Sequence, residues 1–491
     1  MAEQDGEQIS PPPGGLKKWL AFIPDNTSPR ILLIYFSVLL QLIALAVSGT
    51  GYATGGAIYW LTGMIIWILW FFIMFLIVIP RTDTLLQRYR VWLQPVARTI
   101  FIILLIVGIA EGGMLGVFAP GYIKSGASND FVRALEEMSY GFQYNDGAAL
   151  IQQASENLLD GKNPYAHGNI VAAFMKYGGS FDRTTPLQLG RFTNIFPYPT
   201  REQFKQVWDE AVKNPSPPPP ELESHVCYPA GSFLLVTPFV AAGIDDIRFI
   251  YLIFVVAGLV YAAWLIPARR RLLFIGVALI SLEIWNGLAI GETSTMIFPF
   301  LLIAWIALGK NNWLSAVFMG LAVVSKQTAW FFLPFYLILL WRISPPRTLA
   351  YVIGIIAAIF VSFNAYFIII DPAMWLRSIA SPMAEPMFPL GVGIISLVTG
   401  GLINIHTSLL FTIMEVVVFI IGVIWYFRNC RRYPEAGLIL AVLPLFFAWR
   451  SLWTYFFYVA IIILARILIN EPDQSPGLES VNPRLPLKKG H

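Results

Sequence analysis

The sequence predicts an all-α polytopic integral membrane protein with about 12 transmembrane helices. Apolar residues make up 57% of the 491 residues and charged residues only 13%, whereas soluble domains have about 45–50% and about 25%. The mean hydropathy is +0.66. The apolar runs are long enough to approach the roughly 20 residues that a membrane-spanning helix needs, and they are too long for barrel strands.

The charge and the metal-ligating residues exclude several classes of function. A net charge of +4 is too small to indicate a nucleic-acid partner. Two cysteines, Cys227 and Cys430, exclude a disulfide framework and a cysteine zinc site. The four histidines lie far apart in the sequence, which disfavours a histidine metal site.

Fourteen apolar segments are candidate spans, and two of them are unsuited to crossing. Residues 229–243 are short and carry two prolines, and residues 388–404 carry four glycines. We expect both to be re-entrant or interfacial, which leaves twelve spans within a range of 11 to 14. The twelve are 31–50, 57–80, 98–119, 247–266, 272–290, 293–309, 312–325, 328–341, 348–370, 406–427, 436–449 and 453–469.

The positive charges favour this count. If residues 229–243 do not cross, the Arg269–Arg271 cluster falls on the cytoplasmic side with the other basic loops, as the positive-inside rule requires. Both termini are then cytoplasmic, and residues 1–29 and 470–491 are expected to be disordered tails. The two large loops, 120–228 and 371–405, lie outside, where loops carry chemistry.

The first outside loop contains a candidate general base, Asp146. Residues 147–160 have an apolar stripe typical of a helix, which would lie in the membrane interface, and Gly161 ends it. Asp146 precedes the first turn, so one interpretation is an N-cap. The other is a carboxylate that accepts a proton at the membrane surface.

Several short motifs follow one another in a fixed order. Asp146 is followed by Gly161-Lys-Asn-Pro-Tyr165, and then by Tyr228-Pro229. Later come Gly291-Glu292-Thr-Ser-Thr, a Gly-Leu-Ala stretch that ends at Lys326, and Trp453-Thr-Tyr455. The order of these motifs resembles the GT-C superfamily of membrane glycosyltransferases, and in particular the polyprenyl-phosphate-mannose-dependent mannosyltransferases (glycosyltransferase family 87-like). The resemblance covers about residues 98–469, and two additional helices (30–97) precede it.

The resemblance implies an inverting transfer of a hexose, with mannose favoured, from a polyprenyl-phosphate donor to a glycan, lipid or protein acceptor. Asp146 matches the position of the family's base. Lys326, Arg450 and Arg377 are candidates to bind the donor phosphate, because the leaving phosphate needs cations. The plain alternatives are a snorkelling lysine at a helix end for Lys326 and a solvated loop charge for Arg377.

Candidate residues for binding sugar or acceptor are Glu292, Tyr165, His225 and Tyr228. Glu292 lies in a turn between two apolar helices, where an acid is costly and usually functional. A structural ion pair with Lys326 is the alternative. His225 is as compatible with an ordinary polar surface residue. The first loop has no Asp-x-Asp pair, so we expect metal-independent chemistry without a cofactor.

The resemblance also places the protein in a prokaryotic plasma membrane with its site outside. Two other classes fit the apolar composition. A secondary transporter or a flippase for lipid-linked glycans accounts for the spans, but not for the long outside loop with Asp146. A non-catalytic membrane assembly factor needs no acid at position 146.

Overall fold

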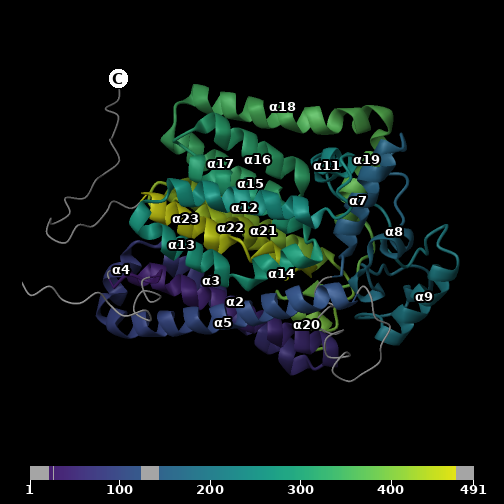
Figure 1. Ribbon diagram of the computed structural model, residues 1–491, viewed down its shortest axis with the longest axis horizontal. Helices are drawn as coiled ribbons and strands as arrows, with labels where there is room; N and C mark the ends of the chain where they lie inside the picture. The colour runs from purple at the N-terminus through teal and green to yellow at the C-terminus, as the bar shows by residue number, and fades with distance from the viewer. Residues whose placement is uncertain (1–21, 26, 123–142, 471–491) are drawn as a thin grey trace, which may run out of the picture.

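The computed structural model describes residues 22–25, 27–122 and 143–470, and long helices run side by side in it while short helices cover one end (Figure 1). Within these described residues, seven helical segments are long and apolar enough to cross a membrane, and a bent pair of helices would make an eighth if it forms one span. The predicted class, a helical membrane protein, is confirmed at this level. The long helices are α2 (Pro29–Thr54), α3 (Ala57–Val78), α5 (Arg90–Tyr122), α12 (Arg248–Leu265), α18 (Pro346–Ile370), α21 (Leu409–Asn429) and α23 (Val459–Asn470), which the 3₁₀ turn η7 (Trp453–Tyr455) precedes.

Four of the predicted spans form shorter apolar helices within the same bundle, so the count of twelve stays a prediction. None of the four reaches the roughly 20 residues of a straight span. They are α15 (Thr293–Ala307), α16 (Asn312–Ser325), α17 (Thr328–Ile343) and α22 (Ala436–Val442), which the 3₁₀ turn η6 (Pro444–Phe447) follows.

The two segments that we expected not to cross form no spanning helix. Residues 229–243 contain only α10 (Gly231–Leu234) and α11 (Thr237–Ala241). Residues 388–404 contain the two-residue strand β1 (Leu390–Gly391) and the single turn α20 (Ser396–Thr399). Prolines in the first segment and glycines in the second prevent a long helix.

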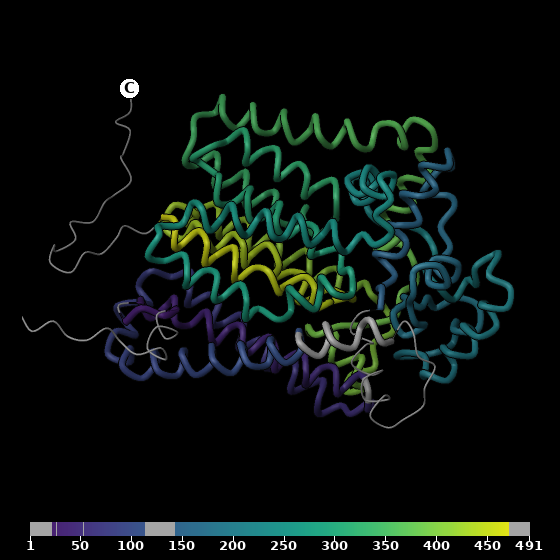
Figure 2. The backbone as a smooth tube through the Cα atoms, viewed as in Figure 1, coloured from purple at the N-terminus to yellow at the C-terminus, as the bar shows by residue number. Residues whose placement is uncertain are grey.

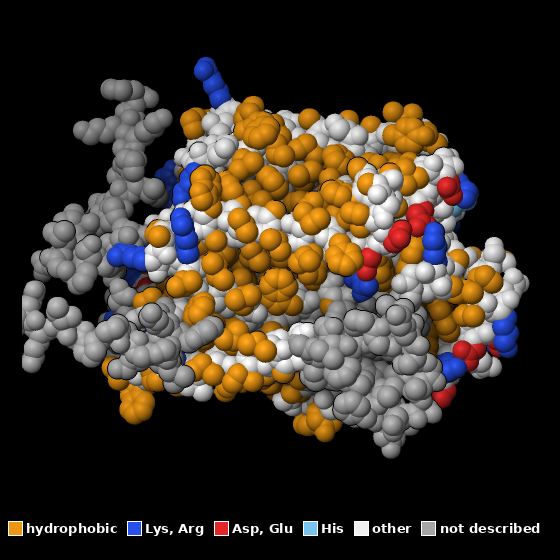
Figure 3. All heavy atoms as spheres, viewed as in Figure 1, with side chains coloured by type: hydrophobic (Ala, Val, Ile, Leu, Met, Phe, Trp, Pro, Cys, Tyr) orange, Lys and Arg blue, Asp and Glu red, His pale blue; other side chains and the backbone are white. Residues whose placement is uncertain are grey.

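The core of the bundle is formed by α15 and α23. Every residue of α15 is buried, and so are Val459 to Leu468 of α23. Figure 2 shows the C-terminal helices in yellow between the green and the purple helices, so the last part of the chain fills the middle of the bundle. Outer helices expose apolar side chains, such as Ile369 of α18 and Ile421 of α21, and Figure 3 shows this apolar surface across the bundle.

Both ends of the described chain lie at the same end of the bundle. Arg30 at the start of α2 pairs with Asp83 of α4 (Arg81–Leu86) at 2.8 Å, and Arg466 near the end of α23 lies 3.4 Å from Glu435. The long loops cover the opposite end (Figure 1). This arrangement agrees with an even number of crossings and with both loops on one side.

The loop layer consists of α7 (Asp146–Leu159), α8 (Ile170–Tyr177), α9 (Arg201–Lys213) and α19 (Pro372–Ala384), with 3₁₀ turns at Phe181–Arg183 and Gly190–Phe192. A further 3₁₀ turn, Gln87–Tyr89, lies between α4 and α5. The helix predicted at 147–160 is therefore confirmed as α7. Its stripe of Ala149, Leu150 and Ala154 is buried against α8, α10 and α11. Figure 1 shows α7 lying across the ends of the long helices.

A bend between two consecutive helices sets the position of the turn that contains Glu292. Helices α13 (Ala268–Ile280) and α14 (Leu282–Ile290) meet at 51°, where the Ser281 hydroxyl donates to the Val277 carbonyl at 2.8 Å. Such a bond to the preceding turn bends helices. α14 ends at Gly291, whose φ of +75° suits glycine.

Part of the predicted N-terminal tail packs on the bundle. Ile23 is buried, and Asp25 pairs with Arg98 of α5 at 2.6 Å. The other residues predicted as tails, 1–21 and 471–491, and residues 123–142 of the first loop lie outside the described residues.

We expect cysteines at the two ends of the bundle to react with a membrane-impermeant maleimide from opposite sides. Asn214 is exposed in the first loop, and Arg432 is exposed at the other end. In a background with Cys227 and Cys430 replaced by Ser, Asn214→Cys should label in intact cells. Arg432→Cys should label only after permeabilisation. Labelling of both from one side would contradict the topology.

Candidate functional site

Asp146 is the first residue of α7, and its carboxylate is not the helix cap. The cap is Asn145, whose Oδ1 accepts from the Ala148 N–H at 2.8 Å, so the N-cap interpretation of Asp146 is wrong. Asp146 Oδ1 accepts from the Gly147 N–H at 2.7 Å, and Oδ2 accepts from the Thr185 hydroxyl at 2.6 Å. The carboxylate is thus held by two donors.

The surroundings of Asp146 make it a stronger base than an exposed aspartate. Burial raises its pKa, while the Thr185 hydroxyl, the Gly147 N–H and the charge of Arg450 act in the opposite direction. The neighbouring charge of Glu292 adds to the rise. A carboxylate with a raised pKa holds a proton more tightly, which suits a general base.

Glu292 and Lys326 form a buried ion pair beside α7. Their charged atoms lie 2.7 Å apart, and the two residues are only 9% and 5% exposed. Glu292 caps the start of α15 by accepting from the Ser294 N–H, and Lys326 follows the last turn of α16. Each charge therefore lies at the helix end whose dipole stabilises it.

Asn145 connects this pair to the candidate base. The Asn145 side chain donates to Glu292 Oε2 at 3.0 Å, while its oxygen caps α7. Lys326 also donates to the Ser294 hydroxyl at 2.8 Å. Since Asp146 follows Asn145 directly, the ion pair and the base belong to one cluster.

Tyr228 faces this cluster, and Tyr165 lies behind it. A Cβ atom at Gly147 would lie 3.1 Å from the Tyr228 hydroxyl, and Lys326 Nζ lies 5.6 Å from the centre of the Tyr228 ring. Tyr165 is 1% exposed and donates to the Tyr228 carbonyl at 3.0 Å. Tyr165 therefore positions Tyr228 and does not itself reach the cluster.

Arg450 brings a second cation close to Asp146. It starts strand β2 (Arg450–Ser451), which pairs in parallel with β1 of the second loop. Its charge acts on Asp146. Arg450 Nη1 is buried and has no hydrogen-bond partner among the described residues. A buried guanidinium N–H without a partner is suited to bind an anion.

Two of the proposed site residues lie apart from this cluster. Arg377 is exposed on α19. His225 turns toward Glu385, with 3.3 Å between Nε2 and Oε1. The structure therefore groups Asp146, Glu292, Lys326, Tyr228 and Arg450, whereas Arg377 and His225 belong to the surrounding loops.

Sequence reasoning missed two residues that hold the site. Asn145 was overlooked because the adjacent aspartate fits the cap pattern equally well. Thr185 has no local signal, since it lies 39 residues from Asp146. Tyr455, noted only as part of a motif, lies with its ring 5.9 Å from Lys326 Nζ.

An apolar groove of about 530 Å³ lies between α16, α17 and α18, and only apolar atoms line it. Val323 and Trp330 line one end and flank Lys326 in the sequence, and the Trp330 ring nitrogen donates to the Val323 carbonyl at 2.9 Å. The groove continues between α17 and α18 to Leu337 and Ile353. Ile353 and Val361 of its wall are exposed, so the groove opens sideways, toward the position of lipid.

Comparison with known protein families, curated proteins and solved structures found no match for this chain. The chemistry of the site therefore has to be argued from its own residues.

We expect Lys326→Met to destabilise the protein, because it leaves the Glu292 carboxylate buried without its cation. Removing one partner of a buried pair costs about 3–5 kcal/mol. Unfolding in mixed micelles by added SDS measures the change. Glu292→Gln combined with Lys326→Met should recover part of the loss. Lys310→Met, at an exposed lysine, should change stability by no more than about 0.5 kcal/mol. Equal stability of Lys326→Met and wild type would contradict the pair.

Proposed function

We propose that the protein is a membrane glycosyltransferase that transfers a hexose, with mannose favoured, from a polyprenyl-phosphate-linked donor to a glycan, lipid or protein acceptor outside the cytoplasm. The observation that carries the proposal is the grouping of a partly buried carboxylate, Asp146, with the cations Arg450 and Lys326. These are the two kinds of charge that glycosyl transfer from a phosphate requires.

In the proposed reaction, Asp146 accepts the proton of the acceptor hydroxyl. The hydroxyl oxygen attacks the anomeric carbon from the face opposite the phosphate and forms the new glycosidic bond. The bond between the anomeric carbon and the phosphate oxygen breaks, and its electron pair leaves with polyprenyl phosphate. The anomeric configuration is inverted, and the reaction as written needs neither a cofactor nor a redox partner.

The leaving phosphate gains negative charge, which nearby cations stabilise. Arg450 offers a buried N–H without a partner among the described residues. Lys326 is held in place by Glu292, and it would bind phosphate by exchanging or sharing that contact. Arg377 is exposed and is better placed to meet lipid headgroups than the reacting phosphate.

The apolar groove supports a lipid-linked donor. A polyprenyl chain is a long hydrocarbon, and the groove between α17 and α18 is lined by apolar atoms alone. With the chain in the groove, its phosphate would lie near Lys326. Glu292 and Tyr228 then remain to bind sugar hydroxyls, and the buried Tyr165 keeps Tyr228 in place.

One observation favours a second candidate, a flippase for lipid-linked glycans or a secondary transporter. The sideways-open groove, together with the buried ion pair, would also suit a lipid that moves across the membrane. Such a protein has no need of a base at Asp146, so a variant at this position separates the two functions.

We expect Asp146→Asn to lose transfer while it keeps donor binding. The amide preserves the shape of the side chain but accepts no proton, and a general base contributes about 10²–10⁴-fold to a rate. Purified protein in nanodiscs is incubated with radiolabelled polyprenyl-phosphate mannose and a total-lipid acceptor extract. Transfer of label is measured for wild type and variant.

The matched control is Asp209→Asn, since Asp209 is an exposed loop carboxylate paired with Lys205 and should leave transfer unchanged. Equal transfer by wild type and Asp146→Asn would exclude Asp146 as the base. Movement of labelled lipid between leaflets without transfer, in both proteins, would favour the flippase.

We expect the acidic limb of the kcat/KM–pH profile to lie above the ordinary aspartate value of 3.8, because burial raises the pKa of Asp146. A base acts only when ionised, so activity rises as pH increases through this pKa. The Thr185 hydroxyl stabilises the anion, so Thr185→Val should move the limb upward by about one pH unit. Thr193→Val, in the same loop, is the control. A limb that stays in place or moves downward would refute the assignment.

A further inference from the structure

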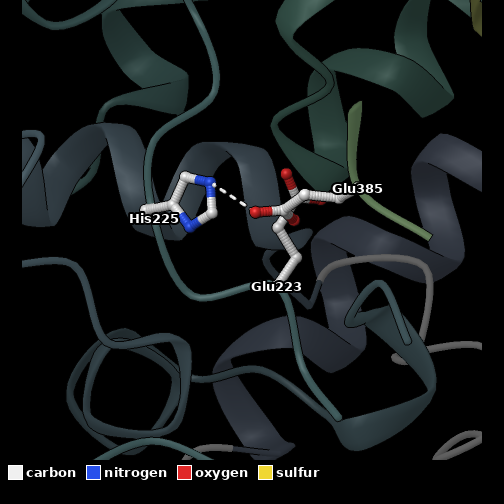
Figure 4. Close-up of side chains that lie close together, drawn as sticks. All are labelled: Glu223, His225 and Glu385. Atoms are coloured by element: carbon white, nitrogen blue, oxygen red, sulfur yellow. Dashed lines mark ion pairs between the residues drawn. The ribbon is translucent and has the colours of Figure 1, made fainter. Parts of the chain in front are cut away.

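Three side chains outside the candidate catalytic cluster come together between the two long loops. Glu223, His225 and Glu385 each offer one ligand atom, and these three atoms lie within 4.8 Å of one another. Figure 4 shows the side chains of Glu223 and Glu385 ending close together and a ring nitrogen of His225 pointing at Glu385. The His225 Nε2 and Glu385 Oε1 atoms are 3.3 Å apart.

The three residues come from distant parts of the chain. Glu223 and His225 lie in the segment that leads to Tyr228, and Glu385 directly follows α19. The Glu385 N–H donates to the Ser381 carbonyl at 2.9 Å, which fixes its backbone to the end of the helix. The cluster therefore joins the first outside loop to the second.

The cluster has too few donors for its acceptors. Glu223 is 7% exposed, and its hydrogen-bond partners are the Ser381 hydroxyl, at a long 3.4 Å, and the weakly donating Cys227 thiol. Glu385 Oε2 and His225 Nε2 are buried and have no hydrogen-bond partner among the described residues. Two carboxylates this close repel, and a buried acceptor without a partner is costly.

Arginine side chains do not neutralise the cluster directly. Arg450 acts on Glu223 and Arg377 acts on His225 only through longer-range electrostatics. Neither forms an ion pair with these residues in the part of the chain that the structure describes. A divalent cation would balance both carboxylates and accept the imidazole nitrogen as a third ligand.

We propose that Glu223, His225 and Glu385 bind a divalent transition-metal cation of the Zn²⁺ or Mn²⁺ kind. Two carboxylate oxygens and one imidazole nitrogen suit these ions, whereas Ca²⁺ and Mg²⁺ prefer oxygen alone. A tetrahedral Zn²⁺ holds its ligands at about 2.0–2.2 Å, and these ligands are then about 3.4 Å apart. The His225–Glu385 distance of 3.3 Å is close to this value, and the Glu223 ligand atom lies within 4.8 Å of both.

The bound ion ties the segment before Tyr228 to α19. Because Tyr228 follows His225 by three residues, the ion positions one wall of the candidate site without touching Asp146. This inference goes beyond the proposed transferase and differs from the metal-free expectation of the sequence. Its test measures metal binding and not transferase activity, so a negative result for one proposal leaves the other untouched.

The test uses the full-length protein in detergent, purified without a chelator and then stripped with EDTA. Metal content is measured by plasma mass spectrometry before stripping, and ZnCl₂ and MnCl₂ are titrated afterwards by calorimetry. We expect one ion per chain and a thermal unfolding temperature that rises with added metal. The ion that binds more tightly identifies the native metal of the pair.

Glu385→Gln and His225→Gln should each weaken binding by at least about tenfold, a loss seen even for second-shell changes, and should abolish the thermal shift. The matched control is His167→Gln, because His167 is an exposed loop histidine and should bind metal as wild type does. If stripped wild type binds neither ion, the site does not exist. If both variants bind as tightly as wild type, the ion is held elsewhere and the proposal is wrong.

Discussion

The buried ion pair between Glu292 and Lys326 is the contact on which the outer end of the bundle depends. It joins the start of α15 to the end of α16 at 2.7 Å, and α15 is the helix whose residues are all buried. Two charges in this position are tolerated because each lies at a favourable helix end and each has further hydrogen bonds. Asn145 extends the same network to α7, so the core of the bundle sets the position of the candidate base.

The two outside loops form one surface because several contacts cross between them. Gln327, next to Lys326, donates to the Cys227 carbonyl of the first loop and to the Ile379 carbonyl of the second. The second loop also pairs with Arg450 through β1 and β2. A site built at this junction draws its groups from five separate stretches of chain, and a metal ion at Glu223, His225 and Glu385 would link the same two loops.

The fold class and the two irregular segments could be predicted because they depend on local properties. Apolar length and the positions of Arg and Lys separate long helices from residues 229–243 and 388–404. The degree to which each helix is buried within the bundle could not be predicted, because α15 and α18 have similar apolar composition. Packing alone makes α15 wholly buried and leaves much of α18 exposed. The same holds for Ile23, which was predicted to be part of a tail but is buried, with its carbonyl accepting a hydrogen bond from Arg98 of α5.

The sequence by itself determined that this is a helical membrane protein with two long loops, because hydropathy and charge act residue by residue. It also marked Asp146, Glu292 and Lys326, since charges beside apolar helices are rare and costly. Only the tertiary structure decided which charges meet. Asn145 caps α7 and leaves the Asp146 carboxylate to Thr185, while His225 turns away to Glu385. These outcomes depend on contacts between residues far apart in the chain, which no local pattern encodes.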